Sequence, residues 1–192
     1  MKTLKTASVI GLILLSPWLL LAGNGTEKIN TKKKFSSETA RIWESQKTFS
    51  LSLLEQMPED QLEYRPNESV RSFAELFKHI AGSSIFLEAI VTGTDVNAAF
   101  AKMGEIEKTH MSKKEVAKLL DENLQRSAEL IRGMSEKDLN KTFTFSFLPD
   151  APVKTYREII VAMGSHMVHH RGQATTYLRM NNIVPSPYQN WW

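Results

Sequence analysis

The sequence contains five histidines and no cysteine, so a metal site in this chain would use imidazole nitrogens and oxygens rather than sulfur. His166 and His170 lie four residues apart in a segment whose apolar residues repeat with a helical period. At about 100° per residue, both lie on or beside the apolar stripe, where two imidazoles one turn apart can share an ion. His169 falls well outside that stripe, whereas His79, in an earlier segment, again faces inward. These residue types and spacings indicate binding of a divalent metal ion.

A second interpretation of the three inward histidines requires no metal. A single histidine on an apolar face is ordinarily a neutral core residue whose ring nitrogens are hydrogen-bonded to the protein. Three such rings in one core are harder to satisfy in this way, because each brings two ring nitrogens that need partners. A divalent ion would take one nitrogen from each ring and leave the other for a hydrogen bond. Spacing alone leaves both interpretations open.

Four amphipathic helices are predicted to position these histidines, because apolar residues recur at steps of three and four along four segments. Pro58 ends the first segment, and capping boxes mark the beginnings of the last two. In each box a serine or threonine is followed three residues later by a glutamate. The boxes are Ser112 with Glu115 and Thr155 with Glu158, and the helices run from about 37 to 57, from 69 or 72 to 91, from 112 to about 134, and from 155 to about 180.

Two long connections join these helices, at roughly 92–111 and 135–154. The second contains residues 142–147, where threonine or serine alternates strictly with phenylalanine, a pattern typical of a short strand. Long crossovers permit bundle topologies other than simple up-and-down. We therefore expect an all-α protein, a four-helix bundle with long connections and at most one short strand or hairpin.

The beginning of the chain has the pattern of a secretory signal peptide, with Lys2 and Lys5 before an apolar stretch at 7–21 and small residues after it. The predicted organisation is a signal peptide at 1–25, a linker at 26–35 and one helical domain at 36–192. This pattern predicts export to the periplasm or another extracytoplasmic space. The alternative is an uncleaved anchor in the inner membrane, although the apolar stretch is short for a spanning helix.

Composition excludes several other classes of protein. With 42% apolar and 23% charged residues, the chain has the balance of a soluble globular protein. Removing the two leader lysines reduces the formal charge from +3 to +1, which implies no nucleic-acid partner. We expect no membrane partner beyond the leader. The sequence leaves a homodimer open.

Two runs of residues resemble the DinB-like family. The run 166–173, HMVHHRGQ, is similar to the last helix of that family, and residues 64–80 are similar to the approach to its first metal-ligand histidine. The resemblance extends from about residue 35 to 188. It implies an up-up-down-down four-helix bundle in which His79, His166 and His170 bind one divalent ion, zinc or nickel, with open coordination positions.

An ion with three neutral ligands and an open position is typical of a catalytic site. The resemblance implies hydrolysis or a thiol-dependent transfer acting on a small-molecule substrate, and the sequence does not choose between them. Gln173, one turn beyond His170, could orient that ring or contact the substrate, and its alternative role is a hydrogen bond between helices. Glu75 could accept a hydrogen bond from His79, although a glutamate at such a position is more often simply solvated. For Arg171 we expect a structural ion pair. The alternative function is a non-catalytic metal-binding or interaction module of the same fold.

Overall fold

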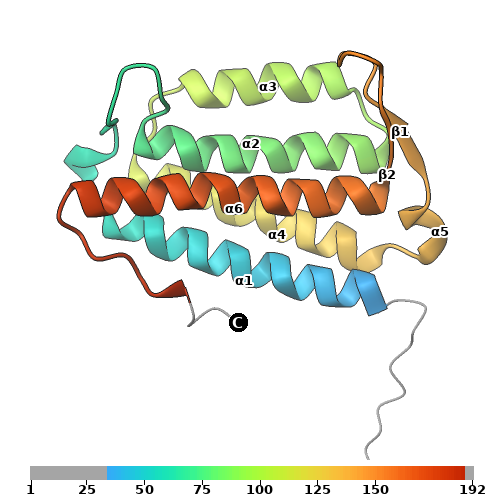
Figure 1. The fold of residues 1–192 in the computed structure, drawn as a ribbon, viewed down its shortest axis with the longest axis horizontal. Coiled ribbons are helices and arrows are strands. Elements are labelled where there is room, and N and C mark those ends of the chain that lie inside the picture. The colour runs from blue at the N-terminus through green and yellow to red at the C-terminus, as the bar shows by residue number, and fades with distance from the viewer. Residues whose placement is uncertain (1–33, 189–192) are drawn as a thin grey trace, which may run out of the picture.

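The computed structural model describes residues 34–188, so the expected signal peptide and nearly all of the expected linker lie outside the described residues. Four long helices make up the bundle (Figure 1). They are α1 (Lys34–Gln56), α2 (Phe73–Thr92), α4 (Lys113–Gly133) and α6 (Tyr156–Met180). All four were predicted, and their ends differ from the expected ones by a few residues.

Side chains at the helix ends explain where these helices begin and stop. The two predicted capping boxes are present at Ser112 and Thr155, and Ser72 forms a third with Glu75 at the beginning of α2. Each box satisfies backbone N–H groups that lack a partner in the first helical turn. The helix α2 stops at Gly93, which adopts the left-handed conformation with φ of 73°.

Contacts between the helix ends fix the direction of each helix. The beginning of α1 meets the end of α4, where the Ser36 hydroxyl donates to the Met134 carbonyl at 2.8 Å, so these helices are antiparallel. The beginning of α6 meets the end of α2, where the Tyr156 hydroxyl donates to the Ile90 carbonyl at 3.0 Å. Near the middle of both helices, the Arg171 guanidinium of α6 donates to the Gln46 carbonyl of α1.

The four helices form two parallel pairs (Figure 1): α1 and α6 run in one direction, and α2 and α4 run in the opposite direction. The two pairs pack against each other, α1 on α4 and α6 on α2. Going around the bundle from α6 through α1 and α4 to α2, the directions are up, up, down, down. In chain order the same helices run up, down, down, up. The return between the parallel helices α2 and α4 is what requires a long crossover.

That crossover is not the loop expected from the sequence, because most of it forms a further helix, α3 (Val96–Lys108). The Asp95 carboxylate caps its beginning by accepting from the backbone N–H groups of Asn97 and Ala98. In Figure 1, α3 lies along the outer side of α2. Gly82 permits this close packing, since a Cβ there would lie 2.5 Å from Met103 Cγ.

The second connection contains a single helical turn, α5 (Glu136–Leu139), and a hairpin of β1 (Thr142–Thr144) with β2 (Val153–Thr155). The strands are antiparallel, with Thr142 opposite Thr155. The predicted strand at 142–147 is therefore present in its first half. A short 3₁₀ turn, η2 (Glu59–Gln61), follows α1. Among residues 34–188, no helix has the length and apolar character that crossing a bilayer requires.

The hydrophobic core lies between the four long helices. It contains fully buried aromatic and aliphatic side chains from each helix, and burying each one contributes roughly 1.5–3 kcal/mol relative to exposure. Examples are Leu53, Phe77, Leu120 and Ile160. The histidines of interest lie on the α2 and α6 faces of this core, so a rigid scaffold holds them.

Candidate metal centre

The structure brings together the three histidines that the sequence singles out. His79 comes from α2, and His166 and His170 come from successive turns of α6. The His166 Nε2 atom lies 3.2 Å from Nε2 of His79 and 2.9 Å from Nε2 of His170. One ring nitrogen from each residue lies within 4.8 Å of the other two. Two nitrogens bound tetrahedrally to one zinc ion would be about 3.4 Å apart. Small movements of the imidazole rings would therefore bring these nitrogens to the spacing that a bound ion requires.

The second ring nitrogens of two of these histidines are held by oxygen acceptors. His79 Nδ1 lies 2.5 Å from Glu107 Oε1, and His170 Nδ1 lies 2.8 Å from Gln173 Oε1. An ionised carboxylate oxygen and an amide oxygen only accept hydrogen bonds, so both Nδ1 atoms carry the proton. In the neutral rings, both Nε2 atoms therefore present lone pairs. Lone pairs aimed at one place, with the outer nitrogens hydrogen-bonded, are the arrangement of imidazoles around a metal ion.

Burial favours the neutral form of His166 and His170. It lowers the pKa of His170 to about 4, although the hydrogen bond that His170 donates to Gln173 opposes this effect, and the neighbouring His166 and His79 reinforce it. Burial, followed by the charge of His79, also lowers the pKa of His166. A metal ion binds the neutral form of imidazole. At neutral pH these two rings are therefore ready to bind without first losing a proton.

The acceptor for His79 is Glu107, which the sequence analysis did not identify. Glu107 lies near the end of α3, a helix that was itself unexpected. The expected acceptor, Glu75, instead accepts from the backbone N–H of Ser72 at 2.7 Å and pairs with Arg65 at 3.2 Å. Because Glu75 is part of the α2 capping box, its carboxylate is directed to the helix beginning and not to His79.

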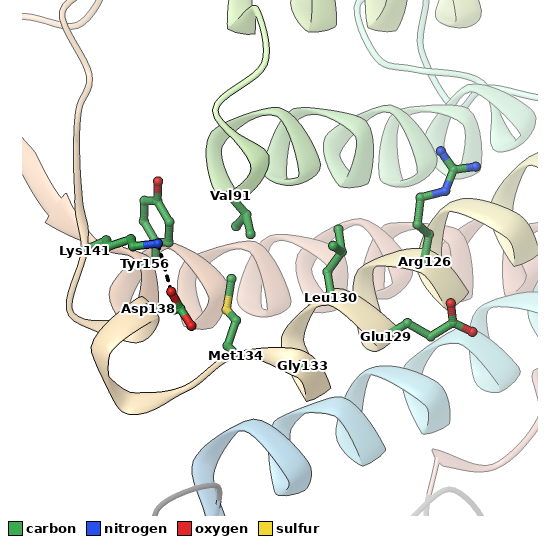
Figure 2. Close-up of a pocket in the computed structure, with 9 residues that line it drawn as sticks. All are labelled: Val91, Arg126, Glu129, Leu130, Gly133, Met134, Asp138, Lys141 and Tyr156. Atoms are coloured by element: carbon green, nitrogen blue, oxygen red, sulfur yellow. Dashed lines mark ion pairs between the residues drawn. The ribbon is translucent and has the colours of Figure 1, made fainter.

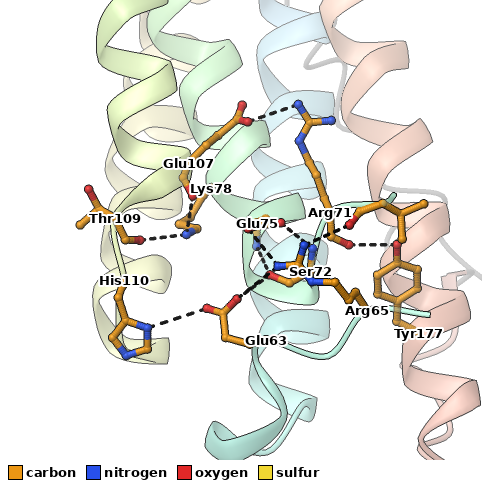
Figure 3. A network of polar contacts seen from close by, with 11 residues as sticks. Glu63, Arg65, Arg71, Ser72, Glu75, Lys78, Glu107, Thr109, His110 and Tyr177 are labelled. Carbon is orange, nitrogen blue, oxygen red and sulfur yellow. Dashed lines mark hydrogen bonds and ion pairs between the residues drawn. The ribbon is translucent and has the colours of Figure 1, made fainter. Parts of the chain in front are cut away.

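A polar network holds Glu107 in place (Figure 3). The buried Lys78 ammonium donates to the backbone carbonyls of Glu107 at 2.8 Å and Thr109 at 2.9 Å, which ties the end of α3 to α2. Glu107 Oε2 pairs with Arg71 Nη2 at 3.3 Å. Burial raises the pKa of Glu107, but the hydrogen bond and charge of His79, together with Arg71, outweigh it and lower the pKa overall. Glu107 is therefore a carboxylate when it binds His79.

The remaining residues near the site are placed as follows. Gln173 contacts His170, so its predicted role in orienting that ring agrees with the structure. His169 is exposed and is not part of the cluster, as the helical wheel indicated. Arg171 has no acidic partner among residues 34–188, which corrects the expected ion pair. Its buried guanidinium instead lies over the rings of Phe49 and Tyr188.

A cleft of about 620 Å³ opens beside the histidines and reaches His170, Gln173 and Glu107. It also contacts Arg71, Tyr177 and the last turns of α3. A second cleft, of about 450 Å³, lies near the hairpin and is lined by Tyr156, Met134 and an ion pair of Asp138 with Lys141 (Figure 2). None of its lining residues is a histidine. Of these two clefts, only the first reaches a histidine of the cluster.

This chain belongs to the DinB superfamily, whose family model matches residues 44–174. Its fold is similar to that of a DinB-like protein from Bacillus subtilis, YjoA, at 20% identity and a TM-score of 0.61, covering 79% of this chain and 96% of YjoA. It is also similar to YfiT from Bacillus subtilis, described as a probable metal-dependent hydrolase with an unusual four-helix bundle topology. That match has 17% identity and a TM-score of 0.59, covering 77% of this chain and 88% of YfiT. No curated protein matched the chain.

Proposed function

We propose that this protein is a metal-dependent enzyme that acts on a small molecule, with His79, His166 and His170 as ligands of one divalent ion. The observation that carries the proposal is the convergence of three imidazole nitrogens beside an open cleft. The description of YfiT as a probable metal-dependent hydrolase supports hydrolysis as the reaction. Zinc and nickel both suit a site of three imidazoles, and we propose one of them.

In this proposal, the residues of the site have different roles. The three histidines supply neutral ligands, and Glu107 and Gln173 fix the orientation of two of the rings. A divalent ion held by three neutral ligands keeps its full charge and an open position, from which it acts as a Lewis acid toward water, a thiol or a carbonyl oxygen. The cleft brings the small molecule to that position. An open cleft supports an enzyme over a non-catalytic module, since an ion with only a structural role needs no access.

Thiol-dependent transfer is a second candidate, and the carboxylates of the cleft favour it. Hydrolysis usually requires a group that accepts a proton from water. The two acidic residues that line the cleft, Glu75 and Glu107, each have both carboxylate oxygens engaged by protein donors. An ion held by the three histidines would favour the thiolate form of a bound thiol, with the proton released to solvent, so that no base from the cleft would be needed. The absence of an unpaired carboxylate among the residues that line the cleft therefore supports thiol-dependent transfer as the second candidate.

We also propose that the protein acts outside the cytoplasm. The proposal depends on residues 1–25, which have the charge and apolar pattern of a signal peptide. Fusing a reporter enzyme after Asn30 tests it in a bacterial host. Reporter activity confined to the cytoplasm would contradict export.

The experiment that tests the enzymatic proposal compares metal-free protein with protein reconstituted with zinc or nickel. Both forms are assayed against a panel of small esters, amides and thiol-transfer substrates. We expect turnover that disappears with a chelator and returns with the metal. The His170→Ala variant should be inactive. Stoichiometric metal without turnover on any substrate of the panel would favour the non-catalytic module instead.

A further inference from the structure

The acidic and basic side chains in the cleft beside the histidines differ in how many protein partners they have. The cleft is lined by two acidic residues, Glu75 and Glu107, and two basic residues, Arg71 and Lys108. Glu75 is bound by Arg65 and the backbone N–H of Ser72, and Glu107 is bound by His79 and Arg71, as described above. Each oxygen of both carboxylates therefore already accepts from one protein donor, and each carboxylate is paired with an arginine.

The basic residues, in contrast, retain free donors. Lys108 is exposed and makes no ion pair with any residue of 34–188. Arg71 donates from Nη2 to Glu107, while its buried Nε has no hydrogen-bond partner among the described residues. A guanidinium has five N–H donors, so one ion pair leaves most of them available. Figure 3 shows the Arg71 guanidinium directed toward Glu107, beside α6.

Besides His170, the remaining polar side chains of the cleft are those of Ser69, His169, Gln173 and Tyr177, and each already has a partner. The Ser69 hydroxyl donates to Asn67 Oδ1 at 2.8 Å, and His169 Nε2 lies 3.3 Å from Gln173 Nε2. The Tyr177 hydroxyl donates to the Arg71 carbonyl at 3.1 Å, and the Gln173 oxygen already accepts from His170. A molecule that fills the cleft thus meets cationic donors of Arg71 and Lys108 that have no partner among the described residues, whereas both carboxylates are already paired with arginines. Such a site favours a ligand that brings acceptors and negative charge.

We propose that this cleft selects substrates that carry a carboxylate, which Arg71 and Lys108 bind while the reacting end of the molecule faces the histidines. This inference rests on the proposed function, because it takes the cleft as the substrate site of a metal-dependent enzyme. The volume of about 620 Å³ is that of a site for a small organic molecule. Since the cleft contacts both Arg71 and His170, one small molecule can reach both.

The test measures binding by titration calorimetry of two probes of nearly equal shape, glutarate and its uncharged diamide, glutaramide. Both zinc-loaded and metal-free protein are used, and zinc content is measured for each sample. We expect glutarate to bind about tenfold to hundredfold more tightly than glutaramide, the range of a charge-assisted hydrogen bond. Arg71→Met should remove most of this preference, and Lys108→Met should reduce it. Lys102→Met is the matched control, because Lys102 carries the same charge on the same helix but does not line the cleft.

The outcomes separate this inference from the proposed function. Equal binding of the two probes, or a preference that survives in both Arg71→Met and Lys108→Met, would overturn the carboxylate site even if the protein holds zinc. If the protein takes up neither zinc nor nickel, the proposed function fails, and the metal-free titrations still decide whether the cleft prefers the carboxylate. Because the Lys108 side chain makes no ion pair or hydrogen bond with the histidines or with the Glu107 carboxylate among the described residues, its variant keeps the test valid if Arg71→Met loses metal or folds poorly.

Discussion

Glu107 provides the sharpest test of how the metal site is built, because it contacts a proposed ligand without being one. Its carboxylate lies 2.5 Å from His79 Nδ1 and also pairs with Arg71. Glu107→Gln keeps an oxygen acceptor for the ring and removes the charge. A charge-assisted hydrogen bond contributes roughly 1.5–3 kcal/mol and a neutral one roughly 0.5–1.5 kcal/mol. The middles of these ranges differ by about 1.25 kcal/mol, which predicts roughly eightfold weaker zinc binding.

Glu107→Ala removes the hydrogen bond entirely, and we expect a loss of about a hundredfold, the upper range for residues that support metal ligands. The assay is competition for zinc against a chelator of known affinity, at one fixed pH. Glu75→Gln is the control, because Glu75 lines the same cleft and contacts no histidine. Unchanged affinity in Glu107→Ala, or an equal loss in Glu75→Gln, would refute the assigned role of Glu107.

Three further predictions concern stability. Gly82→Ala places a Cβ 2.5 Å from Met103 Cγ, so we expect the free energy of unfolding, measured in urea, to fall by about 1–3 kcal/mol. Helix propensity alone predicts that the free energy of unfolding rises. Such a rise would show that α3 packs less closely on α2 than described. Lys78→Met leaves two backbone carbonyls at the end of α3 without their donor and should lower the free energy of unfolding by about 2 kcal/mol or more, and an unchanged urea midpoint would contradict this. Folding lowers the pKa of His166, and that of His170 from 6.5 to about 4, so below pH 6.5 the unfolded chain binds protons that the folded chain does not. Metal-free protein should therefore lose stability as the pH falls from 6.5 toward 4, and urea midpoints that stay constant across this window would contradict the burial of these rings.

The sequence predicts the long helices well because their determinants are local. Apolar residues recur with a helical period, and the boxes at Ser112 and Thr155 act within one turn of the chain. The inward placement of His166 and His170 follows from the same period, since both lie on a single helix. Local sequence patterns do not predict which other helix packs against each buried helix face.

The helix α3 and Glu107 show this limit. Asp95 is a capping residue, and Val96, Phe100 and Met103 recur at helical spacing after it, so a signal for α3 was present within the connection. The role of Glu107 had no local signal, because it depends on packing between α3 and α2, to which Gly82 and Lys78 contribute. Glu75 was the wrong acceptor for His79 because its place in a capping box uses its carboxylate at the helix beginning.

The central claim is that His79, His166 and His170 act as one metal site. Its most direct test is the metal content of protein purified without an affinity tag, measured by elemental analysis for the wild type and five single alanine variants. We predict one divalent ion in the wild type and its loss from each of the three variants, because each ligand contributes a large share of the binding free energy. His169→Ala and His110→Ala should keep nearly full occupancy, since neither residue belongs to the cluster. Full metal content in His170→Ala, or a loss in His169→Ala equal to that in His166→Ala, would contradict the account.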